Sequence, residues 1–67
     1  MRYKVDRKRF EKAILNSGLP IIKIAQNSNV SRPTIYKLLK EDISVNGYII
    51  SRISKVLNVN IEDLIEE

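Results

Sequence analysis

The chain has 67 residues, of which 43% are hydrophobic, and it carries 12 Lys and Arg against 8 Asp and Glu, a net charge of +4. This length allows one domain with a single small core and leaves little room for a deep, walled catalytic cleft. The sequence contains no Cys and no His, which excludes a disulfide, a zinc site of the Cys/His kind, a thiol nucleophile and an imidazole base. We therefore expect no enzyme, no cofactor, no metal and no small-molecule substrate.

Apolar residues recur at the spacing of helices rather than of strands. Asp6 is placed to cap a first helix over residues 7–17, in which Phe10, Ile14 and Leu15 share one face. Residues 1–5 alternate in polarity, as a strand would, but for so short a segment we expect a frayed N-terminal arm.

The next two helices are short and lie close together in the sequence. A second helix is expected over residues 20–27, with Pro20 in its first turn and Ile21, Ile24 and Ala25 facing inward. Asn29 can adopt a left-handed backbone in the connection over residues 28–30. Ser31 then caps a third helix that runs to Lys40.

The third helix has one apolar and one polar side. Ile35, Leu38 and Leu39 project toward the core. The opposite side is basic and partly aromatic, and it comprises Pro33, Tyr36, Lys37 and Lys40, with Arg32 and Thr34 at its margins.

Two closing helices follow a loop over residues 41–45. Asn46 caps the fourth helix, whose inward residues are Ile50, Ile53, Ser54 and Leu57. Asn58 ends it, and Asn60 caps a short fifth helix that holds Ile61, Leu64 and Ile65. The pattern predicts an all-α, compact five-helix bundle forming a single domain over residues 1–67, with the arm at 1–5, the helix pair at 20–40 and the closing helices at 46–67.

Charge is divided unevenly along the chain. Residues 1–40 carry ten Lys and Arg against two Asp and Glu, a net charge of +8, whereas residues 41–67 carry two against six, a net charge of −4. The asymmetry indicates that the first part faces a polyanion. The alternative is ordinary solubilising charge.

Two short helices joined by three or four residues, the second opening with a capped and basic turn, form the geometry that holds a helix in a DNA major groove. The registers at residues 19–25 (LPIIKIA), 29–38 (NVSRPTIYKL) and 56–64 (VLNVNIEDL) resemble the phage-repressor and Cro-like helix-turn-helix family, also called the XRE family, over residues 7–65. Ala25 and Ile35 match its packing positions, and Asn58 stands for the Gly of its closing segment. The resemblance implies the lambda-repressor-like fold, with residues 20–40 as the helix-turn-helix and 31–40 as the recognition helix.

Several positions depart from the family pattern. The family often places a phosphate-binding Gln at the position of Ile21 and a capping Thr or Ser at that of Pro20. An Arg in its first helix and a Glu late in its recognition helix fall on Ile14 and Leu39, so an ion pair is replaced by two apolar residues. We predict that Ile14 and Leu39 touch.

The resemblance also implies which residues contact DNA. Bases would be met by Arg32, Pro33, Thr34 and Lys37, with Tyr36 at the edge. Phosphates would be met by Lys40, and Lys23 and Ser31 are further candidates. Ser31 can instead act as a cap alone, and Tyr36 can instead lie back over the core with its hydroxyl in water.

The sequence leaves two possible roles for the basic residues of the first helix and of the N-terminal arm, and it leaves open which of two isoleucines is exposed. The basic residues of the first helix are either a solvated face or phosphate contacts, and they are Arg7, Lys8, Arg9 and Lys12. Arg2 and Lys4 either enter the minor groove or are disordered. Ile21 and Ile22 cannot both face inward alongside Ile24, so one of them should be exposed.

The resemblance favours a sequence-specific transcriptional regulator, repressor or Cro-like, carried by a phage or mobile element and acting on double-stranded DNA. A homodimer on a two-fold operator is the usual solution for so small a domain. Its apolar surface would come from the acidic end, where Ile61 and Ile65 lie with Ile49 or Val56, unless these residues complete the core.

A protein-interaction module on the same fold is the alternative to a DNA-binding regulator. It would be an antirepressor, an adaptor or an antitoxin that does not bind DNA by itself. No stretch approaches the roughly 18 apolar residues of a membrane span, and the charged start leads into no apolar signal-peptide core. We therefore expect a soluble, cytoplasmic protein without a membrane partner, associated with the nucleoid when it is bound to DNA.

Overall fold

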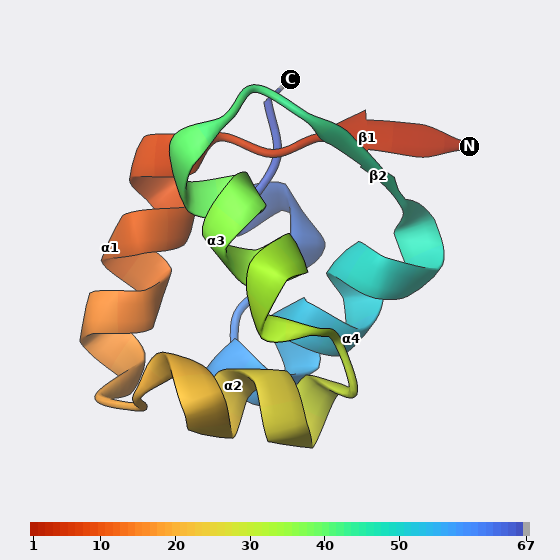
Figure 1. Ribbon diagram of the computed structural model, residues 1–67. Helices are drawn as coiled ribbons and strands as arrows, with labels where there is room; N and C mark the ends of the chain where they lie inside the picture. The colour runs from red at the N-terminus through yellow and green to blue at the C-terminus, as the bar shows by residue number, and fades with distance from the viewer. Residues whose placement is uncertain (67) are drawn as a thin grey trace.

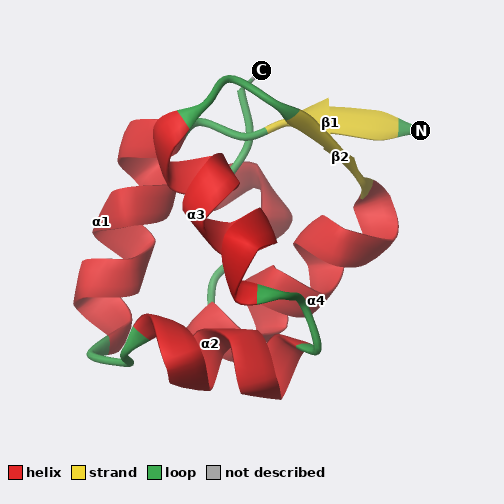
Figure 2. Ribbon diagram, viewed as in Figure 1, coloured by secondary structure: helices red, strands yellow, loops and turns green. Residues whose placement is uncertain are grey.

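A computed structural model describes residues 1–66. Its elements run in the order β1 (Arg2–Lys4), α1 (Arg7–Ser17), α2 (Ile21–Ser28), α3 (Arg32–Lys40), β2 (Ser44–Asn46), α4 (Gly47–Leu57) and a single 3₁₀ turn, η1 (Ile61–Asp63) (Figures 1 and 2). The fold is mostly helical, with four α-helices and a small sheet, and so differs from the all-α five-helix bundle expected from the sequence. No helix within residues 1–66 is both long and apolar enough to cross a membrane.

Local side-chain and backbone signals begin and end most of the helices. The Asp6 carboxylate accepts hydrogen bonds from the N–H groups of Lys8 and Arg9, and the Asn46 side chain accepts one from Ile49 at 2.9 Å. Helices α1, α2 and α4 end at left-handed residues, which are Gly18, Asn29 and Asn58. The predicted caps at Asp6 and Asn46 are thus confirmed.

Pro20 differs slightly from expectation. It is the N-cap of α2 rather than a residue of its first turn, and its carbonyl accepts the N–H groups of Lys23 and Ile24 at 3.0 and 3.1 Å. Proline offers no side-chain cap, so this helix begins on backbone hydrogen bonds alone.

The core lies where α1, α2, α3 and α4 meet. α2 packs against α3 and α4, and α1 packs against α3. The side chains without any exposed area are Phe10, Ile24, Ile35, Leu38, Ile50, Ile53 and Leu64. The expectation that Leu15 faces inward is wrong, because it is 73% exposed and Ala13 is buried instead. The spacing explains this, since positions 10 and 13 lie on one side of a helix whereas position 15 is turned well away from it.

The N-terminal segment is a strand, and the expected frayed arm is wrong. β1 pairs antiparallel with β2 in the register Arg2↔Asn46, Tyr3↔Val45 and Lys4↔Ser44. The C-terminal segment holds the other side, because Glu66 donates its N–H to the carbonyl of Lys4 and Asp6 donates its N–H to the carbonyl of Leu64, both at 2.9 Å. The alternation in residues 1–5 was therefore a true strand signal whose partners lie far away in the sequence.

The expected fifth helix is also shorter than predicted. Only Ile61–Asp63 form a helical turn, of the 3₁₀ type, and the Asp63 carboxylate accepts the N–H of Asn60 at 3.0 Å. The chain then turns so that Leu64 reaches the core and Ile65 forms a bridge with Val5. Residues 65 and 66 thus pair with the N-terminal segment and do not continue the helical turn.

Ile14 on α1 and Leu39 on α3 are both half-buried and pack against the same core, and the two helices are in contact. Leu39→Glu should lower the free energy of unfolding by about 2 kcal/mol, because it desolvates an unpaired carboxylate. Adding Ile14→Arg should restore part of this loss. Urea denaturation measures both values, and a double variant with no recovery would show that the two side chains do not touch.

Candidate nucleic-acid interface

Backbone hydrogen bonds define the connection between α2 and α3. Asn29 has φ 58° and ψ 33°, and its N–H donates to the carbonyl of Ala25. Val30 donates to the same carbonyl at 3.2 Å, and its side chain is buried. The left-handed residue that the sequence predicted at position 29 is therefore confirmed, and it reverses the chain so that α3 lies across the front of the molecule above α2 (Figure 1).

Ser31 caps α3, as predicted. Its hydroxyl oxygen accepts the N–H of Thr34 at 3.4 Å and lies 2.8 Å from the hydroxyl oxygen of Thr34. Pro33 occupies the first turn, where no intrahelical hydrogen bond is lost. One hydroxyl proton is used between Ser31 and Thr34, so the other is free to meet a ligand.

α3 presents a polar face to solvent. Ile35 and Leu38 are fully buried and Leu39 is half-buried, as expected. Tyr36 is 47% exposed, so much of its ring is open to a ligand. Thr34 is half-buried, and the remaining predicted contact residues of this helix and its cap are exposed: Ser31, Arg32, Pro33, Lys37 and Lys40.

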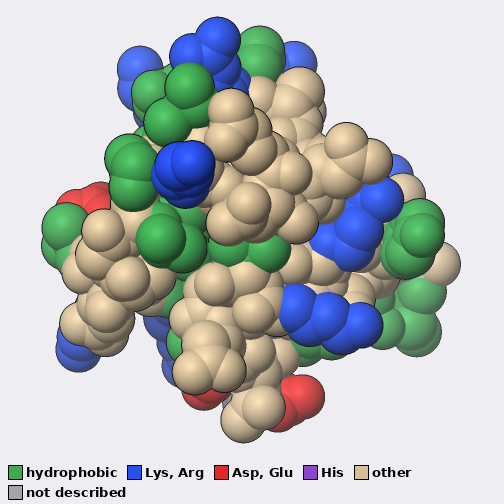
Figure 3. Space-filling model, turned by 90° about the horizontal axis from the view of Figure 1, so that it is seen from below, with side chains coloured by type: hydrophobic (Ala, Val, Ile, Leu, Met, Phe, Trp, Pro, Cys, Tyr) green, Lys and Arg blue, Asp and Glu red, His purple; other side chains and the backbone are tan. Residues whose placement is uncertain are grey.

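The basic side chains of this region are not neutralised by neighbours. The ion pairs of residues 1–66 are Lys4–Glu66, Arg7–Asp42 and Arg9–Asp6, so none involves Lys23, Arg32, Lys37 or Lys40. Figure 3 views the molecule from the side on which α2 lies, and there basic side chains appear at several points while acidic ones lie only near the margins. The four unpaired cations leave a positive potential available to a polyanion.

Two arginines of α1 contact backbone carbonyls, and the sequence did not predict these contacts. Arg7 Nη1 donates to the carbonyl oxygen of Lys40 at 3.0 Å, and Arg7 Nε lies 3.2 Å from Asp42 Oδ1. Arg9 Nη1 donates to the carbonyls of Glu62 and Ile65 at 3.2 and 3.4 Å. The sequence shows that no Gly or Asn directly follows Lys40 to satisfy the end of α3, but it does not identify Arg7 as the partner.

The expected minor-groove arm is not free in the structure. Arg2 and Lys4 belong to β1, where Arg2 donates to the carbonyl of Ser44 and Lys4 Nζ lies 3.6 Å from Glu66 Oε2. Both side chains are therefore engaged by the protein itself.

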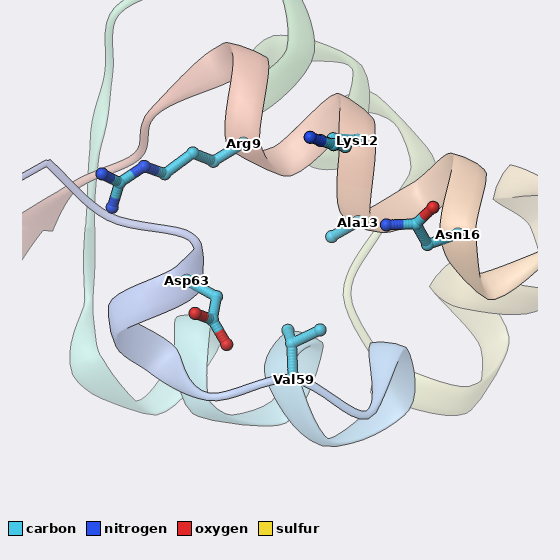
Figure 4. A pocket seen from close by; sticks show the side chains of 6 residues that line it. All are labelled: Arg9, Lys12, Ala13, Asn16, Val59 and Asp63. Carbon is cyan, nitrogen blue, oxygen red and sulfur yellow. The ribbon is translucent and has the colours of Figure 1, made fainter.

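Ile22 is the apolar residue that is exposed at the edge of the motif, at 46%, while Ile21 is half-buried. Ile22 borders a hollow of about 280 Å³ between α2 and the start of α3, also lined by Ala25, Gln26, Val30, Ser31 and Arg32. A second hollow of about 310 Å³ lies between α1 and η1, and Figure 4 shows Asp63 and Val59 pointing into it opposite Ala13 and Asn16. That second hollow is also lined by Arg9 and Lys12, which are phosphate contacts in one of the two readings of α1, but by none of the contact residues predicted on α2 and α3.

A family model described as Cro/C1-type HTH DNA-binding domain matches residues 7–66. The match includes α2, the connection, α3 and every contact residue predicted on them, whereas β1 with Arg2 and Lys4 lies outside it. No curated protein and no solved structure is similar enough to the chain to match it.

The cap of α3 can be tested by removing its hydroxyl. Ser31→Ala should lower the free energy of unfolding by about 1 kcal/mol, because the N–H of Thr34 loses its acceptor. Ser31→Asp should retain the stability of the wild type, since a carboxylate caps equally well. Thermal or urea unfolding gives both values, and wild-type stability in Ser31→Ala would contradict the assigned cap.

Proposed function

Since the chain belongs to the Cro/C1-type helix-turn-helix family of DNA-binding domains, we propose that it is a sequence-specific transcriptional regulator, repressor or Cro-like, whose α3 enters the major groove. The observation that carries this proposal is the polar face of α3, where Lys37 and Lys40 lie opposite buried Ile35 and Leu38 and Arg32 lies at the margin. None of these three cations forms an ion pair within residues 1–66. The protein acts by occupying its site, with no chemical step.

Base discrimination comes from the middle and start of α3. Arg32 and Lys37 donate to guanine O6 and N7, the commonest specific contact in the major groove. Pro33 and the methyl group of Thr34 meet thymine methyl groups, and Tyr36 lies at the edge of the contact. The exposure of Arg32, Pro33, Tyr36 and Lys37 supports the assignment, and Thr34 is half-buried.

Phosphate contacts supply affinity and position the helix. Lys40 at the end of α3 and Lys23 on α2 neutralise backbone phosphates, and the free hydroxyl proton at the Ser31–Thr34 pair donates to another. These contacts carry no sequence information of their own, so their loss weakens binding to all sequences alike.

A homodimer on a two-fold operator supplies the remaining selectivity, because one domain reaches few base pairs. The half-sites would lie about one helical turn apart. The residues expected at the interface, Ile49, Val56, Ile61 and Ile65, are half-buried and pack against the core. They therefore serve the core, and the exposed part of each is what remains for a partner.

A protein-interaction module is the second candidate function, and the exposed Ile22 beside its hollow favours it. An apolar surface at the edge of the motif suits a protein partner better than a phosphate backbone. Duplex-DNA binding at two salt concentrations separates the candidates, because a module of this kind would show no binding even at low salt.

Selection of bound sites from a random duplex library tests the main proposal. We expect an enriched sequence with two-fold symmetry, whose half-site spacing would also report dimerisation. Enrichment of no sequence, despite binding at low salt, would contradict sequence-specific recognition.

Lys37→Ala and Lys40→Ala should weaken binding to the selected site in different ways. Lys40→Ala should weaken binding to all sequences and reduce the slope of log affinity against log salt by about 0.9, because one phosphate contact is lost. Lys37→Ala should relax selectivity at one base position. Lys55→Ala removes an exposed lysine on α4 that is not a predicted contact and is the control. Equal loss of selectivity in the two α3 variants would contradict the assigned roles.

A further inference from the structure

The end of α3 differs from the ends of the other α-helices. α1, α2 and α4 end at left-handed residues, whereas α3 is followed by Glu41 in an extended conformation, with φ −122° and ψ 150°. A left-handed residue is the usual means of turning the chain so that the last carbonyls of a helix find partners. At the end of α3 the carbonyl of Lys40 instead accepts a hydrogen bond from the Arg7 side chain, at 3.0 Å.

A second contact orients the Arg7 guanidinium. Arg7 Nε lies 3.2 Å from Asp42 Oδ1, two residues beyond the end of α3. One planar group thus joins the backbone of Lys40, the last residue of α3, to the side chain of Asp42 in the segment that follows it. The fixed fork of an arginine can serve two such acceptors at once, which a lysine ammonium does less well.

The position of Arg7 in its own helix is unfavourable. It is the first residue of α1, whose first turn holds no acidic residue, and a cation at a helix N-terminus opposes the helix dipole. At the C-terminus of α3 the same cation is favoured. Because both side chains of the Arg7–Asp42 pair are about half exposed, at 46% and 56%, the pair contributes little to stability.

We propose that Arg7, held by Asp42, is a positioning residue for DNA binding that fixes the C-terminal end of α3 and thereby directs Lys40 to a phosphate. The inference rests on the proposed function, since it concerns the same interface. It assigns to Asp42 a favourable role in binding a polyanion, although a carboxylate near DNA would ordinarily repel phosphates.

Asp42→Asn is the sharpest test, because the two explanations predict opposite signs. If Asp42 positions Arg7, the variant should bind the selected duplex about threefold more weakly than the wild type. If Asp42 is merely a nearby negative charge, removing it should strengthen binding. Glu41→Gln is the matched control, since Glu41 is an adjacent exposed carboxylate and forms no ion pair within residues 1–66. It should bind as tightly as the wild type or more tightly.

A double-mutant cycle with Lys40 tests whether Asp42 affects DNA binding through Lys40. In a Lys40→Gln background, Asp42→Asn should cause no further weakening, because the phosphate contact that it positions is already absent. Asp42→Glu should bind the duplex as tightly as the wild type, because it keeps the carboxylate. Arg7→Lys should weaken binding as much as Arg7→Gln does, because an ammonium serves the two acceptors less well than a guanidinium. Circular dichroism and thermal unfolding should show that all variants are folded at the binding temperature.

Three outcomes would overturn the inference. The inference is wrong if Asp42→Asn binds as tightly as Glu41→Gln, or if Asp42→Asn still weakens binding in the Lys40→Gln background. If Arg7→Gln lowers the salt slope by about one while Asp42→Asn has no effect, then Arg7 itself contacts a phosphate. Failure of the wild type to bind any duplex at low salt is a separate result, because it would refute the proposed function and the inference with it.

Discussion

The complete burial of Ile35 and Leu38 is the constraint on which the arrangement of this molecule depends. The two residues are three positions apart and therefore lie on one side of α3, so burying both sets the rotation of the helix about its axis. The opposite side, with Lys37 and Lys40 and with Arg32 at its margin, is then directed to solvent. Removing a buried leucine side chain costs about 2–5 kcal/mol, which is large compared with the total stability of a small domain. Core packing thus determines which residues can meet a ligand.

Electrostatic contacts follow the same division of the surface. The ion pairs of residues 1–66 gather where the two chain ends and the start of α1 meet, and there Arg9 also binds the carbonyls of the C-terminal segment. Arg32, Lys37 and Lys40, the exposed cations of α3, form no ion pair within residues 1–66. The basic residues of the sequence therefore fall into two regions. In the first, Lys and Arg side chains form ion pairs and hydrogen bonds within the protein, and in the second, on α3, they are free to bind a polyanion. Arg7 links the two regions, because it belongs to the first and contacts the end of α3.

The features that could be predicted from the sequence are those whose causes are local. Caps at Asp6, Ser31 and Asn46 and the left-handed Asn29 and Asn58 depend on hydrogen bonds within a few residues, and all are present. The strand β1 was missed because its partners, β2 and the C-terminal segment, lie far along the chain. The carbonyl contacts of Arg7 and Arg9 were missed for the same reason. The exposure of the α3 side chains was predictable from helical periodicity, whereas their partners on DNA depend on a second molecule and stay predictions.

The most direct test of the account is to map the surface that changes when DNA is added. An isotope-labelled sample titrated with the selected duplex would report each backbone amide by ¹H–¹⁵N correlation spectra. The account predicts that the largest shifts fall on residues 31–40 and the start of α2, with small changes at residues 59–66. Shifts concentrated on α1 and η1, around the hollow between them, with α3 unaffected, would contradict it.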